Sequence, residues 1–262
     1  MKLSVFLLAY NHERFIEQAL RSVLMQRTSF DFELIIGEDA STDGTAAIVR
    51  RFQQQHPDKI RATIRAQNVG MHRNFIESYQ ACTGEYVAFL DGDDYWTSPD
   101  KLQKQVDFLE AHPSYSMCFH NVYRRREEQD EMAGLGLDPL ETRQTWELED
   151  LIEEPTIPSC SIVTRNRLID RFPDWLPEVA VVDWIFNLLN ARYGSAGFLP
   201  EPMGVYRLHA SGTWSPRDRL WHKDQVLKIY ERLPGILDRR HWPLIRKCQA
   251  SLRTWYELEA AV

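Results

Sequence analysis

Three carboxylates stand within four residues at the end of a short apolar run. In residues 84–96, Asp91, Asp93 and Asp94 directly follow the β-type run Tyr86–Leu90. Carboxylates this close together repel one another unless a cation lies among them. Hard oxygen ligands suit Mg²⁺ or Mn²⁺, ions that commonly bridge one or two carboxylates to substrate phosphates. The stretch therefore predicts a metal–diphosphate site at the tip of a strand.

Two other interpretations of the acidic stretch have to be considered. Asp and Gly dominate surface turns, so Asp91–Asp94 could also be an acidic turn without a ligand. A calcium loop of the EF-hand type needs a glutamate at its twelfth position. Counted from Asp91 that position is Leu102, which excludes a calcium loop of this type.

The acidic stretch belongs to a regular alternation of expected strands and helices. Short β-type runs predict strands at Leu3–Tyr10, Phe32–Ile36, Ile60–Ile64 and Tyr86–Leu90. Helical spacing of apolar residues predicts helices at Glu13–Gln26, Thr45–Gln55 and Arg73–Cys82. This order predicts an α/β fold with a mainly parallel, doubly wound sheet flanked by helices. The loops after its strands should lie along one edge, where ligands bind.

The second part of the chain is expected to be more mixed. A helix is predicted from Ser98 to Ala111, and the charged, glycine-bearing segment Arg124–Glu141 is predicted to be a mobile loop. Further strands are predicted at Ser116–Tyr123, at Ser159–Thr164 and within Phe198–Leu208, and further helices at Trp146–Glu154 and Asp183–Tyr193. From Arg217 the pattern is helical almost to the end, with breaks at Pro234-Gly235 and Pro243.

Composition excludes several classes of protein. The 262 residues carry a net charge of −7, which argues against a nucleic-acid binder that relies on neutralising phosphates. No apolar run is long enough to span a bilayer. The start of the chain shows no signal-peptide pattern. The four cysteines form no C-x-x-C pair, so reduced thiols are expected rather than a zinc site or a disulfide framework.

Read in order, these segments resemble the inverting glycosyltransferases of family 2, which have the nucleotide-diphosphosugar (GT-A) fold. The resemblance covers residues 3 to about 215. The motifs that carry it are Ala9-Tyr10-Asn11, Ser22–Gln26, Glu38–Thr45, Asn68-Val69-Gly70, Gly84-Glu85-Tyr86, Phe89–Asp94, Val182-Asp183-Trp184 and Tyr206-Arg207-Leu208-His209. Each motif is weak alone, but together in this order they are specific.

The resemblance implies a binding site for the donor nucleotide. Asp39 would accept the N–H of the base, usually uracil. Ala9 and Tyr10 would line the base pocket, and Asn68 would belong to the same nucleotide-sugar site.

The resemblance also implies a metal site and a catalytic base. Asp91 and Asp93 match the family's D-x-D signature, in which the first carboxylate approaches the ribose and the second carries the metal. Asp94 would share one of these tasks. His209 matches a later histidine that reaches the metal or the diphosphate. Asp183 matches the catalytic base, which takes the proton of the acceptor hydroxyl.

The sequence departs from the family pattern at three points. Val182 precedes Asp183 where the family usually has a glutamate, so the acceptor lacks one carboxylate that could orient it. Glu38 precedes Asp39 where a second aspartate is usual. The Q-x-x-R-W motif of processive synthases is absent, which favours the addition of a single sugar.

Each singled-out residue also has an ordinary structural interpretation. Asp183 could be a helix cap, since Asp is a preferred capping residue. His209 could be a surface histidine. Trp96 and Trp184 could be sugar platforms, although core packing is the commoner role of tryptophan. Three further histidines are interpreted as loop or core residues: His12, His72 and His120.

Together these observations predict a catalytic domain over residues 1–215, with a nucleotide-binding half (1–97) and an acceptor half (98–215), followed by a C-terminal helical extension (216–262). The expected activity is the metal-dependent, inverting transfer of one sugar from a nucleotide-diphosphate sugar, UDP-linked by resemblance, to a glycan or lipid-linked acceptor. The expected cofactor is Mn²⁺ or Mg²⁺. The expected location is the cytoplasm. Apolar and basic residues near Trp221–Tyr230 also allow peripheral contact with the inner face of a membrane.

Two other functions compete with this prediction. A sugar nucleotidyltransferase would need a glycine-rich phosphate loop near the first strand, and Leu8–Arg14 contains no glycine. A non-catalytic module that binds nucleotide sugar or glycan would not need Asp93, Asp183 and His209 together.

Overall fold

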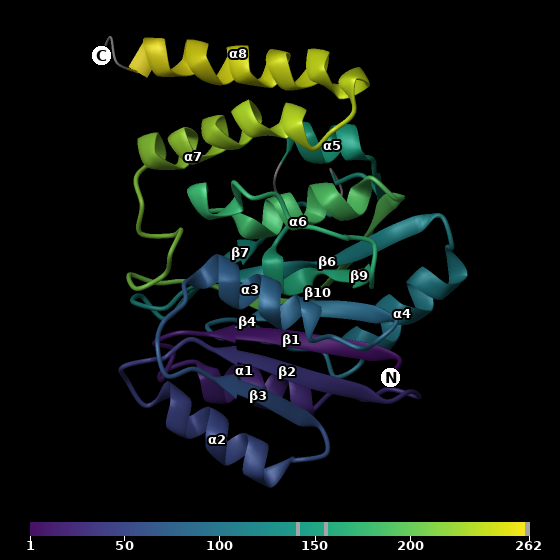
Figure 1. The fold of residues 1–262 in the computed structure, drawn as a ribbon, viewed down its shortest axis with the longest axis vertical. Coiled ribbons are helices and arrows are strands. Elements are labelled where there is room, and N and C mark those ends of the chain that lie inside the picture. The colour runs from purple at the N-terminus through teal and green to yellow at the C-terminus, as the bar shows by residue number, and fades with distance from the viewer. Residues whose placement is uncertain (140–141, 155–156, 260–262) are drawn as a thin grey trace.

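One continuous sheet runs through the molecule, with helices on both of its faces (Figure 1). The computed structural model describes residues 1–139, 142–154 and 157–259. Within these residues ten strands form the sheet, in the order β3-β2-β1-β4-β9-β6-β10-β5, with β7 paired to β6 and β8 paired to β10. The predicted α/β class with a mainly parallel, doubly wound sheet is confirmed.

The first half of the sheet is parallel and doubly wound. Its strands are β1 (Leu3–Ala9), β2 (Phe32–Glu38), β3 (Ile60–Ile64) and β4 (Tyr86–Asp91), and β1 lies between β2 and β4. The helices between them are α1 (Ile16–Leu24), α2 (Thr45–Gln55) and α3 (Met71–Gln80). Alternate residues of β1 point to opposite faces. Phe6 packs with α3, whereas Leu7 packs with α1 and α2.

The second half of the sheet mixes strand directions. The long strand β6 (Tyr115–Arg126) pairs in parallel with β10 (Ser195–Leu208) and antiparallel with β9 (Val163–Arg165). Because β9 also pairs antiparallel with β4, it joins the two halves. The short strands β5 (Tyr95–Trp96) and β8 (Thr145–Trp146) pair antiparallel with β10.

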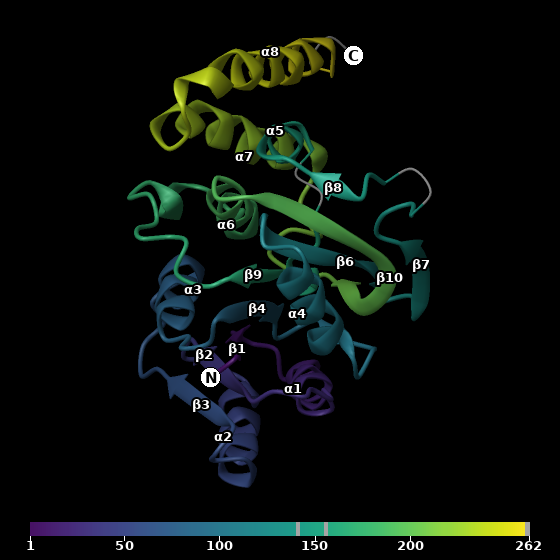
Figure 2. The same ribbon diagram turned by 90° about the vertical axis from the view of Figure 1, so that its right-hand side faces the viewer.

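Three helices complete this part of the fold. They are α4 (Lys101–Ala111), α5 (Leu148–Glu153) and α6 (Val182–Ala191). Figure 2 shows α6 and α4 on opposite sides of the sheet, and the core agrees. Phe186 of α6 packs with Phe75 of α3, whereas Leu102 of α4 belongs to the same cluster as α1 and α2.

Two predictions of secondary structure within the sheet are wrong. The segment Arg124–Glu141 is not a loop, because β6 continues to Arg126 and β7 (Glu131–Leu135) pairs back on it. Its charges lie across the two strands, as in the ion pair of 3.1 Å between Arg126 and Glu131, and cross-strand pairs of this kind stabilise a sheet. Residues 140–141 lie outside the described residues. Of the predicted strand Ser159–Thr164, the first residues form a 3₁₀ turn instead, Ser159–Ser161.

The C-terminal helices lie against α5 and α6 at one end of the molecule (Figure 1). They are α7 (Arg219–Arg232) and α8 (Trp242–Glu259). The predicted break at Pro234-Gly235 is confirmed by a short 3₁₀ turn after α7. Pro243 does not break a helix, since it stands in the first turn of α8, where proline is tolerated. Residues 260–262 of the predicted extension lie outside the described residues.

The apolar side of the C-terminal helices is largely used for packing. Ile229, Leu233 and Ile245 are fully buried in the core cluster that includes α6. No helix in the described ranges is long and apolar enough to cross a membrane. Of the apolar residues in Trp221–Tyr230 that suggested contact with a membrane, Ile229 and Tyr230 are buried, whereas Trp221, Val226 and Leu227 are partly exposed.

Lys101, the first residue of α4, is a lysine buried in the protein core. Its side chain is fully buried, and Nζ lies 3.8 Å from the centroid of the Trp96 ring. Among the described residues Nζ has no hydrogen-bond partner. Burial lowers the pKa of Lys101 from 10.5 to about 7, because an ammonium group is costly to charge in apolar surroundings.

Replacing Lys101 with methionine is expected to raise the free energy of unfolding at pH 7, and by less at higher pH. Between about pH 7 and pH 10 the unfolded lysine keeps a proton that the folded one has lost. The unfolded state then binds more protons, so wild-type stability rises by up to about 1.4 kcal/mol per pH unit. The advantage of Lys101→Met should shrink over this range, as measured by urea unfolding.

Lys104→Met is the matched control for this prediction. Lys104 lies on the same helix, is 41% exposed and pairs with Glu201, so its replacement should show no comparable pH dependence. A stability difference for Lys101→Met that is constant from pH 7 to pH 10 would contradict the lowered pKa of Lys101.

Candidate active site

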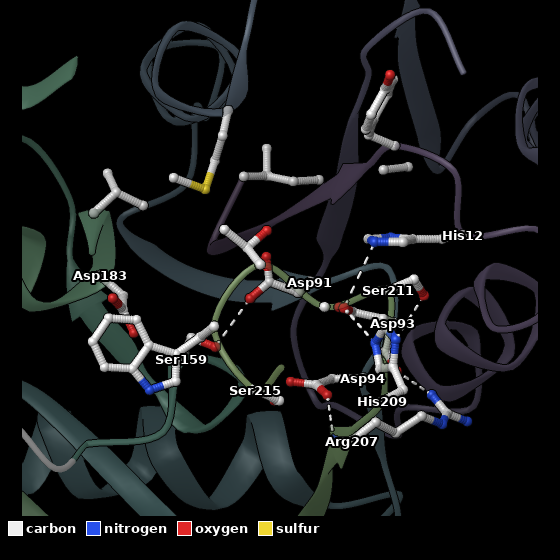
Figure 3. A pocket seen from close by; sticks show the side chains of 18 of the residues that line it. His12, Asp91, Asp93, Asp94, Ser159, Asp183, Arg207, His209, Ser211 and Ser215 are labelled. Carbon is white, nitrogen blue, oxygen red and sulfur yellow. Dashed lines mark hydrogen bonds and ion pairs between the residues drawn. The ribbon is translucent and has the colours of Figure 1, made fainter. Parts of the chain in front are cut away.

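The carboxyl ends of β1, β2 and β4 open into a cleft of about 500 Å³, which Figure 3 shows from close by. The end of β10 and the first turn of α6 form its other walls. The residues that the sequence predicted to bind the nucleotide sugar or the metal, or to act as the base, all line this cleft: Ala9, Tyr10, Asp39, Asn68, Asp91, Asp93, Asp94, Asp183 and His209. Strand ends of parallel sheets are where ligands usually bind, so the topology explains why residues distant in sequence meet here.

Asp93 lies between two histidines (Figure 3). His209 Nε2 is 3.0 Å from Asp93 Oδ2, and His12 Nε2 is 3.6 Å from the same oxygen. Burial acts to raise the pKa of Asp93, but His12 and His209 outweigh it and lower the pKa to about 2. His209 is 4% exposed, so its interpretation as a surface histidine is wrong.

Gly92 allows His12 to approach the acidic loop. A Cβ at Gly92 would lie 2.7 Å from His12 Nδ1 and 2.8 Å from the Leu8 carbonyl oxygen. Any other residue would therefore push His12 away or distort the end of β1. The sequence analysis interpreted His12 as a loop or core histidine, whereas the structure brings it to Asp93. The glycine between two aspartates was the only sign of this close approach.

Asp91 and Asp94 are held apart by different partners. The Ser159 hydroxyl donates to Asp91 Oδ2 at 3.0 Å, and the Arg207 backbone N–H donates to Asp94 Oδ1 at 2.8 Å. Burial, together with the charge of Asp93, raises the pKa of both carboxyls well above the usual value. Asp94 Oδ2 is buried and has no hydrogen-bond partner among the described residues. A cation among these carboxylates would relieve their mutual repulsion.

Arg207 fixes the acidic loop to the end of β10. Its guanidinium donates to the Asp93 carbonyl oxygen and to Gln18, and forms an ion pair of 2.8 Å with Glu127. It also lies over the ring of Tyr95, 4.4 Å from the centroid. Because these contacts occupy the guanidinium, Arg207 positions the loop that carries Asp93.

Asp39 lies at the end of β2 and joins two loops of the cleft. It is 2% exposed, and its two carboxylate oxygens accept hydrogen bonds from the backbone N–H groups of Val69 and Gly70 at 2.8 and 2.9 Å. Gly70 has a φ of 87°, a conformation that favours glycine. Asn68 donates to the Asp39 carbonyl oxygen at 3.0 Å. A carboxylate has about four lone-pair sites, so Asp39 can still accept from a base.

The other side of the predicted base pocket is formed at the end of β1. Ala9 is buried, whereas Tyr10 is 45% exposed. Tyr10 and Asp39 line the same cleft, and a partly exposed aromatic ring is well suited to cover a flat ligand.

Asp183 lies in the first turn of α6 and lines the cleft. Its Oδ1 accepts the Trp184 backbone N–H at 2.9 Å. The N-cap of α6 is Val181, without a side-chain cap bond, so the interpretation of Asp183 as a helix cap is wrong. Burial raises the pKa of Asp183 to about 6, although the hydrogen bond from Trp184 acts in the opposite direction.

The segment before Asp183 is anchored from two sides. His72 Nε2 donates to the Val179 carbonyl oxygen at 2.6 Å, and the Ala180 backbone N–H donates to Gln225 Oε1 at 3.1 Å. These contacts tie the approach to Asp183 to α3 and to α7.

Trp96 and Trp184 are core residues, so their interpretation as sugar platforms is wrong. They are 1% and 3% exposed. Their indole N–H groups donate to the carbonyl oxygens of Cys160 and Leu151. The tryptophan that lines the cleft is Trp214, which the sequence analysis missed because its segment shows no periodic pattern.

The acidic loop fits a divalent ion that a ligand completes. No group of three or more His, Cys, Asp or Glu side chains in the described part of the chain is arranged to hold a metal alone. Asp93 and His209 supply a carboxylate oxygen and an imidazole nitrogen 3.0 Å apart, and Asp94 Oδ2 is buried without a partner. Mg²⁺ and similar ions are often bound by one or two carboxylates plus substrate phosphates, which matches this incomplete set.

The fold places a polar cleft at the carboxyl ends of parallel strands, where α/β proteins usually bind their ligands. The profile described as "Glycosyl transferase family 2" matches residues 4–172, and the chain belongs to that family. Asp183 and His209 lie beyond the matched range.

The chain is also similar in sequence to bacterial proteins. The chain is 36% identical over 243 residues to TuaG of Bacillus subtilis, provisionally assigned as a teichuronic acid biosynthesis glycosyltransferase, and the match covers 88% of each protein. It is 37% identical over 223 residues to the uncharacterized protein Rv1520 of Mycobacterium tuberculosis. That match covers 84% of this chain and 63% of Rv1520, so the chain spans less than two thirds of that relative.

Solved structures share the fold. The mannosyltransferase PcManGT of Pyrobaculum calidifontis, in complex with GDP-Man and Mn²⁺, superposes with a TM-score of 0.68 at 18% identity over all of this chain and 75% of its own. TarS of Staphylococcus aureus in complex with UDP-GlcNAc superposes with a TM-score of 0.66 at 19% identity, covering 96% of this chain and 71% of its own. The expected GT-A fold is thereby confirmed.

Proposed function

We propose that this family 2 glycosyltransferase moves one sugar from a nucleotide-diphosphate sugar to a hydroxyl group of a glycan or lipid-linked acceptor, with inversion at the anomeric carbon and with help from Mn²⁺ or Mg²⁺. The observation that carries the proposal is that the Asp93–His209 pair and Asp183 line one cleft. One end of the cleft thus suits a metal-bound diphosphate, and the other suits a proton acceptor.

Each residue has a chemical task in this proposal. Asp39, Ala9, Tyr10 and Asn68 bind the nucleoside, and Asp91 approaches the ribose. Asp93 and His209 hold the divalent ion, and Asp94 supports them. When bound, such an ion neutralises the charge that grows on the departing diphosphate.

Asp183 acts as the general base. It takes the proton of the acceptor hydroxyl while that oxygen attacks the anomeric carbon and the bond to the diphosphate breaks. A base with a pKa near 6 is mostly ionised at neutral pH, and it is efficient because its pKa lies close to the working pH. Attack from the face opposite the leaving group inverts the anomeric configuration in one displacement.

The relatives support a role in the assembly of cell-surface polysaccharides. TuaG is assigned to teichuronic acid biosynthesis, and TarS is named as a poly(ribitol-phosphate) β-N-acetylglucosaminyltransferase. One structural neighbour binds a UDP-linked sugar and the other a GDP-linked sugar, so the neighbours do not select the base. We favour UDP because of the sequence resemblance alone. A cytoplasmic location and peripheral membrane contact stay predictions from the sequence.

The proposal is tested with a panel of UDP-, GDP- and dTDP-linked sugars. At least one should raise the melting temperature in the presence of Mn²⁺ and not in the presence of EDTA. The same compound should be hydrolysed slowly without an acceptor, because water can replace the hydroxyl that attacks. Stabilisation without hydrolysis or transfer would indicate a binding module, and no stabilisation by any donor would contradict the proposed function.

A further inference from the structure

The segment between β10 and α7 forms one wall of the cleft. Residues 211–215 and Arg217 all line it, together with Asp183. This wall lies beyond residues 4–172, which the family profile matches. Asp183 and His209 also lie beyond that range, but none of the motifs that carried the family resemblance includes residues 211–217.

Trp214 is the large apolar side chain of this wall, and two aromatic rings of α7 pack against it. Its ring stacks on the His222 ring, with centroids 4.1 Å apart and an angle of 17° between the planes. His222 Nε2 donates to the Trp214 carbonyl oxygen at 3.0 Å. The Trp221 ring meets Trp214 edge-on at 5.5 Å. One face of the indole is thus covered by His222, and the half-buried Trp214 also lines the cleft.

The part of α7 that contacts Trp214 is also linked to the segment before Asp183. His222 and Gln225 are three residues apart on α7, so they lie on the same side of that helix. Gln225 Oε1 accepts the Ala180 backbone N–H at 3.1 Å, and Ala180 precedes Asp183 by three residues. The wall begins beside the proposed metal ligands, where Ser211 Oγ lies 2.8 Å from His209 Nδ1, and it reaches Trp214 and the contacts with α7 three residues later. Trp214 is therefore better placed to contact what Asp183 deprotonates than to contact the nucleotide.

We infer that Trp214 is a platform for a sugar ring of the acceptor, so that the acceptor is a saccharide rather than an open-chain polyol or a bare lipid phosphate. The inference rests on the proposed function, because it assigns the acceptor to the Asp183 end of the same cleft. An indole face is electron-rich, and the C–H groups on one side of a pyranose are weakly positive and apolar. Stacking would hold the ring while its hydroxyl groups stay free to reach Asp183.

This platform compensates for a departure in the sequence. Val182 stands where the family usually has a second carboxylate beside the base. An aromatic face orients a sugar by shape and needs no charged partner, so Trp214 supplies an alternative way of orienting the acceptor.

The test uses methyl glycosides of glucose, galactose, mannose, rhamnose and N-acetylglucosamine as probes. Methyl groups are chosen because an aromatic aglycone could itself stack on Trp214. Binding is measured by saturation-transfer NMR with UDP and Mn²⁺ present, and ribitol and glycerol phosphate serve as probes without a ring. At least one glycoside should bind the wild-type protein. Its affinity should fall about tenfold or more in Trp214→Ala and recover in Trp214→Phe, which restores an aromatic face.

Two controls separate the platform from general damage. Tyr193→Ala removes another exposed aromatic ring, which lies at a separate hollow, and should leave glycoside binding unchanged. The affinity of Trp214→Ala for UDP with Mn²⁺ should stay within about twofold of wild type, since the proposed nucleotide site is formed by Asp39, Ala9, Tyr10 and Asn68. A large loss of UDP affinity, or a loss that appears only with the intact nucleotide sugar, would assign Trp214 to the donor and overturn the inference.

Failure of this inference can be told apart from failure of the proposed function. If the wild-type protein hydrolyses a nucleotide sugar but binds none of the glycosides, or binds them equally well in Trp214→Ala, the acceptor platform is wrong and the transferase proposal stands. If no nucleotide sugar binds or is hydrolysed, the proposed function itself fails.

Discussion

Asp183→Asn is expected to lower the rate of sugar transfer by about 10²-fold or more while the affinity for the donor stays near the wild-type value. Asparagine keeps the shape of the side chain and can still accept the Trp184 N–H through Oδ1, which lies at 2.9 Å in the structure. It cannot take a proton from the acceptor. The measurement is the turnover number at saturating donor and acceptor, with donor affinity measured separately by calorimetry.

The pH dependence of the wild-type enzyme provides a second readout. A helix N-terminus favours the ionised form of a carboxyl, but burial outweighs this effect and raises the pKa of Asp183 to about 6. The base works only when it is ionised, so turnover should fall as the pH is lowered through about 6 and level off above it. Asp174→Asn is the matched control, because Asp174 is an exposed carboxylate in the preceding segment that pairs with Arg171. Turnover of Asp183→Asn close to wild type would show that the base lies elsewhere.

The fold could be predicted from the sequence where a local pattern decided the structure. The four strands of the first half are short apolar runs between helices with a clear period, so their order alone gave the doubly wound sheet. The segment Arg124–Glu141 was misjudged because β7 is stabilised by pairing with β6 across a turn. Its charged residues face partners on the neighbouring strand, and this information lies in the pairing rather than in either segment.

The site was predictable in its residue types and less so in its contacts. Asp91, Asp93, Asp39 and Asp183 follow strands or begin helices, so topology brings them to one edge. His12 could not be found in this way, because its role depends on a close approach to Gly92. Trp214 lies in an irregular segment, and only tertiary packing against His222 brings it to the cleft. Residues placed by topology could thus be predicted, whereas residues placed by packing could not.

Asp93→Asn is expected to abolish the effect of Mn²⁺ on the binding of the donor nucleotide. In the wild-type protein UDP should bind more tightly with Mn²⁺ than with EDTA, because the ion joins the diphosphate to Asp93 and His209. Even changes next to a metal ligand typically cost about 10- to 100-fold in metal affinity, and the loss of a carboxylate ligand should cost at least as much. The measurement is titration calorimetry of UDP with and without Mn²⁺.

The sequence alone suggested that removing Asp93 would relieve repulsion among three carboxylates. The structure changes that expectation, because His12 and His209 lower the pKa of Asp93 to about 2, whereas its neighbours Asp91 and Asp94 have raised values. Asp93 is thus the carboxylate of the loop whose ionised form is the most favoured, which suits a ligand of a cation. Asp100→Asn, an exposed carboxylate just after the loop, is the control and should keep the full effect of Mn²⁺. If Asp93→Asn binds UDP with the same gain from Mn²⁺ as wild type, then the ion is held by other residues, and the assignment of Asp93 and His209 as its ligands is wrong.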